Sequence, residues 1–393
     1  MASRVFFHIG LPKSGTTFLQ TRMWHDRALL RGQGFLYPGR DRMDHFHATQ
    51  VVRELDHVPP ARADSWDRLV RAVTRWDGPA IITHEFFCIA TAEQARRAVA
   101  DLGETEVRVV VTARDYLRQF PAVWQEALKM GYAGRLDPFM DQTLRERPDR
   151  PWGWPSQDLP AVLRRWAEAV PIDRLHVVTV PPPEAPRDLL WRRWCELTGI
   201  DSSEFRQDSA VVNGSLGAAQ AALLERVVPH LSPSLHEGPD RHRWVRQYFG
   251  HDVLRRQSGE RFGLDEAHAA ELRRLAIDAV AEVRELGCPV TGDLAELVPP
   301  EQQPYRAHPD RVPDAEVLDV ATRAIDQMIR DVRDLTAERN QWRRKARELE
   351  RNQVAAVPPP PPPRSSVRAR GVHGLRRRLF ARPPRETSPK DRP

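Results

Sequence analysis

Residues 7–20 read FHIGLPKSGTTFLQ and join an apolar run to a helical pattern. The apolar run, residues 4–9, is typical of a buried strand, and a helix is expected from about Thr16 to Ala28. Between them, the glycine-bearing turn Gly10–Thr17 lets backbone N–H groups point into one cavity. The positive end of the helix dipole adds to the attraction for phosphate oxygens. The sequence therefore predicts a phosphate-binding loop at the end of the first strand.

The spacing of this loop resembles that of the Walker loop, G-x-x-x-x-G-K-[ST], with one difference in the position of the lysine. Thr16 stands where the Walker loop needs its lysine, and the lysine is instead Lys13, before the second glycine. A magnesium-nucleotide hydrolase is therefore disfavoured, although phosphate binding is not.

The rest of the N-terminal part alternates apolar runs with helical patterns. Short runs rich in β-branched residues occur at Ala80–Thr83, Val107–Thr112 and His176–Val180. Continuous apolar runs are typical of strands covered on both faces, and strands separated by helices imply parallel βαβ units. We expect an α/β fold over residues 1–300, with a P-loop-type three-layer parallel sheet flanked by helices.

Length and composition fit one large soluble α/β domain with an appendage. The chain has 393 residues, of which 40% are hydrophobic and 29% charged. Its apolar runs are too short to cross a bilayer, and no charged-then-apolar leader precedes the first strand. The three cysteines, Cys88, Cys195 and Cys288, have no paired spacing. These features favour a cytoplasmic protein without disulfides or a zinc site.

A second region begins after Pro313, beyond a linker expected at residues 301–313. Residues 314–353 form an amphipathic helix or coiled coil whose apolar positions alternate steps of three and four. This seam comprises Leu318, Ala321, Ile325, Met328, Val332, Leu335, Trp342, Ala346 and Leu349, with Arg339 as a polar interruption. Such spacing is typical of a coiled coil and predicts a homodimer. The alternative is a single helix that folds back on its own domain.

Residues 354–393 combine a polyproline segment, Pro358–Pro363, with a basic tail. Ten Lys or Arg residues and two acidic residues lie in 364–393, so the excess positive charge of the chain belongs to this tail. The tail has too few apolar residues to fold alone. We expect weak contact with an anionic membrane, with nucleic-acid binding or a purely solvated end as alternatives.

The loop residues closely resemble the 5′-phosphosulfate loop of sulfotransferases that use 3′-phosphoadenosine 5′-phosphosulfate as donor. The resemblance implies that Lys13 holds the bridging oxygen and neutralises the leaving phosphate. It also implies that Thr16 and Thr17 bind the 5′-phosphate, within a loop completed by Ser14 and Gly15, and that Phe18 stacks on adenine. No metal is required.

A second stretch, Val109–Asp115, resembles the strand after which these sulfotransferases grip the 3′-phosphate of the donor. The resemblance implies that Arg114 makes this contact, and a guanidinium suits phosphate. The family places a serine eight residues after the arginine, where this chain has Ala122. One contact to the 3′-phosphate is therefore absent or made by another residue.

A third stretch, Ile81–Glu85, resembles the strand end at which sulfotransferases carry their general base. His84 and Glu85 are both candidates for this role. The family's cytosolic branch has a lysine two residues before its histidine, and this chain has Ile82 there. This difference favours Glu85, with His84 as partner or alternate, and one of the two could instead cap the next helix.

The sequence thus predicts a sulfotransferase that acts on a hydroxyl or amine of a small molecule, sugar or lipid. Residues 35–65 and 230–262 are expected to line the acceptor site. The cluster Asp41, Asp44, His45 and His47 fits no standard metal spacing and is interpreted as a polar loop on the acceptor side. The alternatives are a P-loop phosphotransferase or nucleotide kinase, and a non-catalytic coiled-coil scaffold.

Overall fold

The computed structural model describes residues 2–147, 153–205, 215–236, 238–302 and 306–355. The chain divides into two compact units, Met1–Asp331 and Val332–Pro393. The polyproline segment and the basic tail lie outside the described residues.

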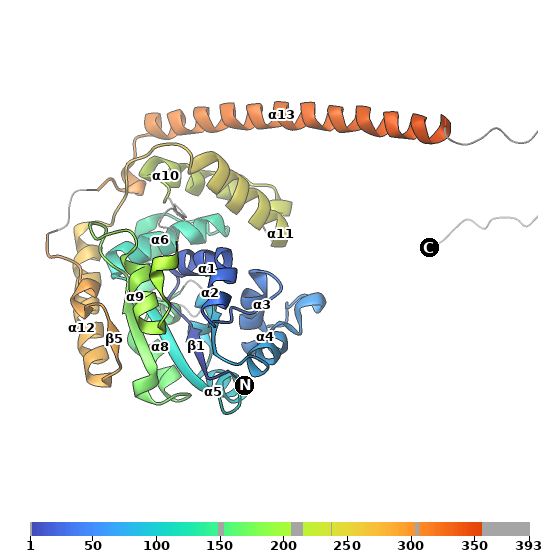
Figure 1. Ribbon diagram of the computed structural model, residues 1–393. Helices are drawn as coiled ribbons and strands as arrows, with labels where there is room; N and C mark the ends of the chain where they lie inside the picture. The colour runs from blue at the N-terminus through green and yellow to red at the C-terminus, as the bar shows by residue number, and fades with distance from the viewer. Residues whose placement is uncertain (1, 148–152, 206–214, 237, 303–305, 356–393) are drawn as a thin grey trace, which may run out of the picture. The chain divides into compact units, whose positions relative to one another are not determined.

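A parallel sheet of five strands forms the centre of the first unit (Figure 1). The strands are β1 (Arg4–His8), β2 (Pro79–Thr83), β3 (Glu106–Ala113), β4 (Leu175–Thr179) and β5 (Val290–Thr291). Their order is β2-β1-β3-β4-β5, and every neighbouring pair is parallel. The expected fold class is confirmed.

Helices cover both faces of the sheet because side chains alternate along each strand. One face carries α1 (Thr16–His25), α2 (Arg27–Gly32) and α9 (Leu189–Thr198). There, Phe6 and Val110 belong to the same core cluster as Leu19 and Trp194. The other face carries α4 (Ser65–Thr74), α5 (Ala92–Ala100), α8 (Leu159–Ala167) and α12 (Glu266–Leu286). Both faces are buried, which explains why the strands read as continuous apolar runs.

A second, helical core joins α6 (Tyr116–Lys129), α7 (Leu136–Glu146), α10 (Ala218–Val227) and a π-helix, η8 (Arg241–Leu254). Trp124, Phe139, Leu224 and Val245 are buried in this core. Figure 1 shows α6 and α10 beyond one end of the sheet, on the side of α1. α3 (Met43–Val52) packs against α4.

The segment expected to be a linker, 301–313, is not a free connection in its described part. Residues 306–313 belong to the first unit, and His308 and Pro309 are buried. Asp310 accepts hydrogen bonds from the backbone N–H groups of Leu136 (3.0 Å) and Asp137 (3.1 Å) and so caps α7. Proline and charged residues made this segment look like a linker, but its polar groups are used in packing.

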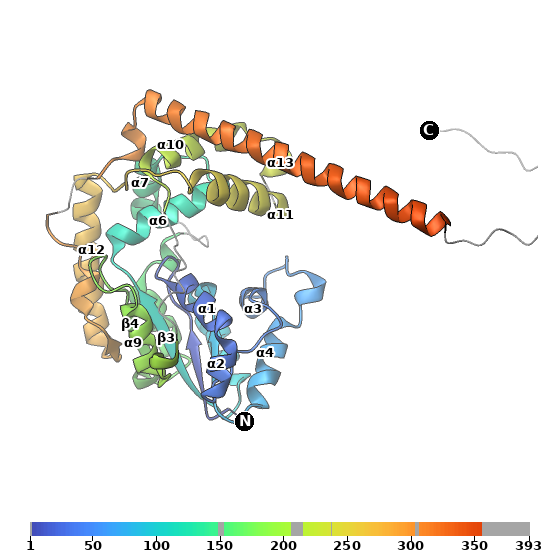
Figure 2. The ribbon, with the colours of Figure 1, turned by 45° about the horizontal axis from the view of Figure 1, so that its top comes forward.

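The helix expected at 314–353 is present as α13 (Asp314–Ala355). Its first turns contact the helical core through Val317, Val320 and Ala324, which are buried. Of the predicted seam, Ala321 also packs against this core, whereas Leu318 and Ile325 are 67% and 58% exposed. The sequence offered two alternatives for this helix, a coiled coil or a helix folded back on its own domain. Neither alternative considered that α13 has a second apolar face. Figure 2 follows α13 along its length.

The sequence predicts no disulfides and no apolar run long enough to cross a bilayer. Cys88, Cys195 and Cys288 are free and buried. Among the described residues, none of the helices combines the length and the apolar character that a membrane crossing requires.

Candidate functional site

The site lies where the strand order changes direction. β1 is followed in sequence by β2 on one side, and the chain then returns to place β3 on the other side of β1. In open parallel sheets, ligands bind outside the carboxyl ends of the strands at such a switch point. The predicted loop follows β1, and Arg114 follows β3 directly. The topology thus brings the first two sequence motifs together.

The loop backbone adopts a conformation that few residues accept. Gly15, the N-cap of α1, has φ 84°, and Lys13 has φ 67°. A residue other than glycine in this left-handed region of backbone conformation costs about 1–3 kcal/mol. Residues strained in this way occur often at functional sites. At Gly10, a Cβ atom would lie 2.3 Å from Thr112 Oγ1. The glycines are therefore required by the turn itself.

A buried network fixes the loop to three strands. The ring of His8 lies 2.7 Å from Thr83 Oγ1 through Nδ1 and 3.1 Å from Thr112 Oγ1 through Nε2. Thr112 Oγ1 lies 2.7 Å from Ser14 Oγ, which also donates to the carbonyl of Leu11. Burial lowers the pKa of His8 to about 3, so the ring is neutral. The Ser14 hydroxyl therefore connects the loop to β3 through Thr112.

Lys13 forms an ion pair with a carboxylate of the helical core. Its Nζ lies 2.7 Å from Oε2 of Glu126 on α6, whose side chain is only 3% exposed. Arg246 of η8 contacts the other oxygen, Oε1, and Lys129 Nζ lies 3.6 Å from Oε2. Burial alone would raise the pKa of Glu126, but these three cations hold it well below its ordinary value. One carboxylate thus serves three positive charges.

The same cluster perturbs Lys129 and His251. Burial, with the charges of Lys13 and Arg246, lowers the pKa of Lys129 to about 8 against the opposing effect of Glu126. Burial, with the charges of Lys129, Arg246 and Arg255, lowers the pKa of His251 to about 4. Positive charge is therefore in excess around Lys13, which favours the arrival of an anion.

Arg114 presents a guanidinium with unused hydrogen-bonding capacity. Its Nη1 donates to the carbonyl of Lys13 (3.3 Å), while its buried Nε has no hydrogen-bond partner among the described residues. Burial and neighbouring Arg118 lower the pKa of Arg114 to about 10. Arg118 is itself occupied, because it contacts Asp115 and the carbonyl of Pro181. An anion beside Arg114 would satisfy the unpaired Nε.

His84 and Glu85 follow the end of β2, as the alternative of a capping residue anticipated. His84 is the N-cap of the short helix η2 (Glu85–Ile89), and its Nδ1 accepts the N–H of Phe86 at 3.2 Å. Glu85 Oε2 accepts from Gln20 of α1 at 3.0 Å and lies 3.8 Å from His84 Nδ1. The two side chains are therefore neighbours and do not point to opposite faces of a strand.

These contacts separate the roles that the two side chains can take. Burial, with Arg53 and His47, lowers the pKa of His84 despite the charge of Glu85, which keeps the ring neutral. Because Nδ1 accepts a backbone hydrogen bond, the proton of the neutral ring resides on Nε2, which can then only donate. Burial would raise the pKa of Glu85, but His84, Gln20 and Lys13 bring it below its ordinary value. Glu85 is therefore ionised and able to accept a proton.

The remaining loop residues are placed unequally. Thr16 is buried at the start of α1, whereas Thr17 is exposed. Phe18 is half-buried and packs against the core cluster around Phe6 and Trp194. Their contacts with donor phosphate and adenine stay predictions.

The cluster Asp41, Asp44, His45 and His47 has a structural explanation. Asp44 is fully buried and binds Arg62 (2.7 Å) and Arg68 (3.1 Å). His45 Nδ1 accepts the backbone N–H of Thr83 at 3.3 Å, and its Nε2 lies 2.9 Å from the carbonyl of Pro38. These bonds join the loop before α3 to β2. Phe46 brings α3 beside the site, with its ring 5.4 Å from that of His84.

Sequence reasoning missed Glu126, Arg246 and His8 as parts of this site. Glu126 carried one local signal, since an acidic residue in the apolar stretch Phe120–Leu128 needs a cationic partner when buried. Arg246 gave none, because only the tertiary fold brings η8 to α6. Arg246 belongs to the stretch 230–262 that is expected to line the acceptor site, and this expectation stays a prediction.

Comparison with known proteins adds little. No protein-family model and no curated protein matches the chain. A solved structure, a sulfotransferase from Alicyclobacillus acidocaldarius, matches 73% of this chain and 95% of its own. Its identity is 12% and the TM-score is 0.37. We draw no functional conclusion from a similarity of this size.

Proposed function

We propose that the first unit is a sulfotransferase that moves a sulfuryl group from 3′-phosphoadenosine 5′-phosphosulfate to a hydroxyl or amine acceptor. The observation that carries the proposal is the pairing of Lys13 and Arg114 across the switch point. The two residues are joined by the 3.3 Å bond from Arg114 Nη1 to the Lys13 carbonyl. A donor with two separate phosphate positions needs two such cations.

The residues present fit this donor. The orphaned Nε of Arg114 suits a phosphate oxygen, and the strained loop before α1 offers backbone N–H groups to a second phosphate. Ser14 and Gly15 shape this loop, while Thr16 and Thr17 start the helix. Phe18 would contact the adenine. The donor supplies the activated sulfuryl group.

The chain's own residues then divide the chemistry. Glu85 accepts the proton of the acceptor as the acceptor oxygen or nitrogen bonds to sulfur. Lys13 meets the negative charge that develops on the phosphate oxygen as the sulfur–oxygen bond breaks. His84 donates from Nε2 and orients the acceptor. No step requires a metal.

The position of the loop lysine disfavours a phosphotransferase, because Thr16 occupies the Walker lysine position. Retention of the full chain on an immobilised adenosine 3′,5′-bisphosphate resin tests the proposal, with elution by free ligand. Mg²⁺–ATP at equal concentration is expected not to elute the protein. Preferential elution by Mg²⁺–ATP would favour a kinase.

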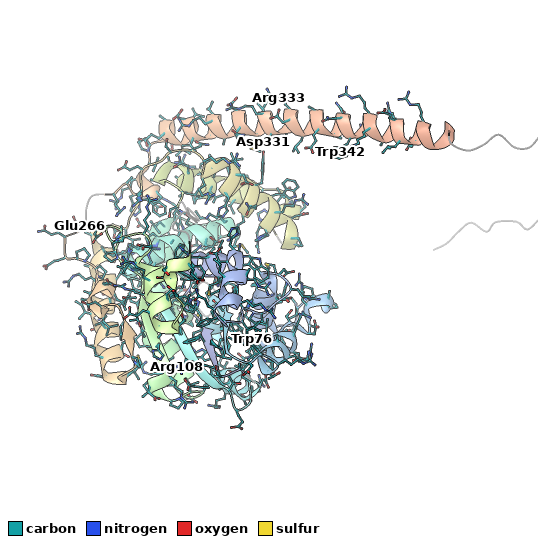
Figure 3. All side chains as sticks on the ribbon, in the orientation of Figure 1. Trp76, Arg108, Glu266, Asp331, Arg333 and Trp342 are labelled. Carbon is teal, nitrogen blue, oxygen red and sulfur yellow. The ribbon has the colours of Figure 1, made fainter. Side chains whose placement is uncertain are left out.

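Arg114→Ala provides the variant arm of this experiment. The substitution should weaken binding of adenosine 3′,5′-bisphosphate by about 10- to 100-fold, the scale of one charge-assisted contact. The matched control is Arg108→Ala on β3, the strand that Arg114 follows; Arg108 is labelled in Figure 3, and its guanidinium contacts Glu106 instead. Equal loss in both variants would contradict the assignment. If calorimetry detects no binding of adenosine 3′,5′-bisphosphate to the wild-type chain, the alternative of a non-catalytic coiled-coil scaffold, suggested by Ala122, would be supported.

A further inference from the structure

A second cluster of polar side chains lies outside the site built around Lys13. Its members come from three segments of the first unit: the start of α7, the start of α12 and the segment before α13. They are Asp137, Asp265, His268 and His308. Asp265 is the N-cap of α12 and directly precedes Glu266, which is labelled in Figure 3.

Three atoms of this cluster are buried without a hydrogen bond. Asp137 Oδ1, His268 Nδ1 and His308 Nε2 have no hydrogen-bond partner among the residues that the structure describes. The His308 side chain is only 7% exposed. Unsatisfied buried polar atoms are costly, and three together require an explanation.

The atoms form two groups that share Asp137 Oδ1, one with Asp265 and His268 and the other with His308 and Asp310. Asp137 Oδ1 lies 3.0 Å from His308 Nε2 and 3.7 Å from His268 Nδ1. His268 Nδ1 lies 3.0 Å from Asp265 Oδ1. Zinc bonds of about 2.0–2.1 Å in a tetrahedron separate neighbouring ligand atoms by about 3.3 Å. The observed separations surround this value.

The protonation of His268 is also that of a metal ligand. Its Nε2 lies 3.3 Å from Asp141 Oδ1, and a carboxylate can only accept, so Nε2 carries the proton. The lone pair of Nδ1 then faces the oxygens of Asp137 and Asp265. A histidine that donates through one nitrogen to a carboxylate and binds a cation through the other is the usual arrangement at metal sites.

We propose that Asp137, Asp265 and His268 bind a divalent transition-metal ion, with Zn²⁺ as the best match. Imidazole nitrogens together with carboxylates select this class of metal. His308 is not a ligand, because its Nδ1 accepts the N–H of Asp310 (3.3 Å) and its ring proton is therefore on Nε2, which faces Asp137 Oδ1 at 3.0 Å. Asp310 is excluded because both oxygens of its carboxylate accept backbone N–H groups at the start of α7, whereas Asp265 caps α12 through Oδ1.

The ion would join α7 and α12, which are distant in sequence. A metal that binds only the folded state stabilises it, so the site would act in stability and not in sulfuryl transfer.

The test uses the full chain, first analysed for metal content and then treated with chelator and titrated with Zn²⁺ by calorimetry. We expect one equivalent to bind, with a Kd below about 1 µM, and the unfolding temperature to rise with Zn²⁺. His268→Gln and Asp137→Asn should each weaken binding by about 10- to 100-fold or more. The control is His57→Gln, which removes an exposed histidine elsewhere.

Cobalt provides a readout that depends on coordination and not on folding. Co²⁺ bound to the wild-type chain should give the intense visible absorption of a tetrahedral site, and one equivalent of Zn²⁺ should remove it. The proposal is overturned if the wild-type chain binds no Zn²⁺ saturably, or if both variants keep wild-type affinity. In those cases the cluster is a network of polar contacts without a metal. If a variant fails to fold, the Co²⁺ spectrum of the wild-type chain still decides the question.

Discussion

Lys13 interacts with two carboxylates that come from different parts of the fold. Glu126 binds it directly at 2.7 Å, and the charge of Lys13 also lowers the pKa of Glu85. Without a donor, Glu126 keeps the lysine ordered and its charge balanced. An arriving phosphate offers the same ammonium a second negative partner. The residue proposed to stabilise the leaving group is therefore already oriented.

Lys13→Ala should nearly abolish sulfuryl transfer while the protein stays folded. Loss of a group that stabilises the charge of the transition state costs about 3–4 kcal/mol, or roughly 10²–10³-fold in rate. Transfer of labelled sulfate from the donor to acceptors in a cell extract, read by mass spectrometry, measures the effect. Lys345→Ala on α13 is the control for loss of a lysine. Wild-type rates in Lys13→Ala would mean that the donor site is wrongly assigned.

Glu85→Gln should reduce turnover by about 10²–10⁴-fold with little change in donor affinity, because a general base acts on the acceptor. His84→Gln should have a smaller effect, since the proton on Nε2 prevents the neutral ring from acting as base. Because the pKa of Glu85 is lowered, the wild-type rate should fall only at a pH below the ordinary range of a glutamate. An active Glu85→Gln beside an inactive His84→Gln would transfer the role to His84.

Glu126→Gln tests whether the cations around this carboxylate are available to an anion. The variant leaves Lys13, Lys129 and Arg246 without their shared negative partner, and such a loss typically destabilises by about 3–5 kcal/mol. Adenosine 3′,5′-bisphosphate should offset part of this loss. The ligand should therefore raise the unfolding temperature more in the variant than in the wild type. An equal or smaller rise would show that the ligand phosphates bind elsewhere.

At the scale of elements, the strands and the loop were predictable because their signals are local. The apolar runs at 80–83, 107–112 and 176–180 each match a strand to within one or two residues. The loop and Arg114 follow strands that the topology makes neighbours, so both appear at one edge. Glu126, Arg246 and the Asp137–His268 cluster were not predictable. Their partners are distant in sequence, and only the packing of α6, η8, α7 and α12 defines them.

Two buried histidines connect these elements and should make the fold sensitive to acid. Burial lowers the pKa of His8 to about 3 and that of His45 to about 4, from the model-peptide value near 6.5. Between pH 6.5 and 4, the unfolded chain binds protons at these positions while the folded chain does not. Their contribution is thus intact above pH 6.5 and is lost as the pH falls through this window.

Urea unfolding at pH 7 and pH 4.5 measures this effect. Each histidine should account for about 2–3 kcal/mol of the lost free energy of unfolding at pH 4.5. His45→Gln should be less stable at pH 7 and should lose less stability on acidification than the wild type. The control for removal of a histidine is His57→Gln. The same pH dependence in wild type and His45→Gln would contradict the explanation.

At the scale of the whole molecule, α13 carries two apolar faces with different contacts. Val317, Val320 and Ala324 are buried in the helical core of the first unit. Leu318, Ile325 and Met328, at the seam positions, are 67%, 58% and 37% exposed. The seam continues beyond Asp331, where Val332 and Leu335 are each 62% exposed. An apolar stripe of this spacing is stable in water when a second helix covers it.

We therefore expect the full chain to form a dimer through the seam of α13. Arg339 and Ala346 occupy seam positions in the second half of the helix and weaken knobs-into-holes packing, so the affinity should be modest. Light scattering at several concentrations measures the mass. Leu335→Glu, which places a charge in the seam, should give a monomer, whereas the control Gln341→Glu, outside the seam, should not.

A chain that ends after Asp331 is the informative truncation, because ending at Pro313 would remove Val317 and Val320 and uncover the helical core. A full chain that is monomeric at tens of micromolar contradicts this prediction, and so does a dimer that survives both Leu335→Glu and the truncation.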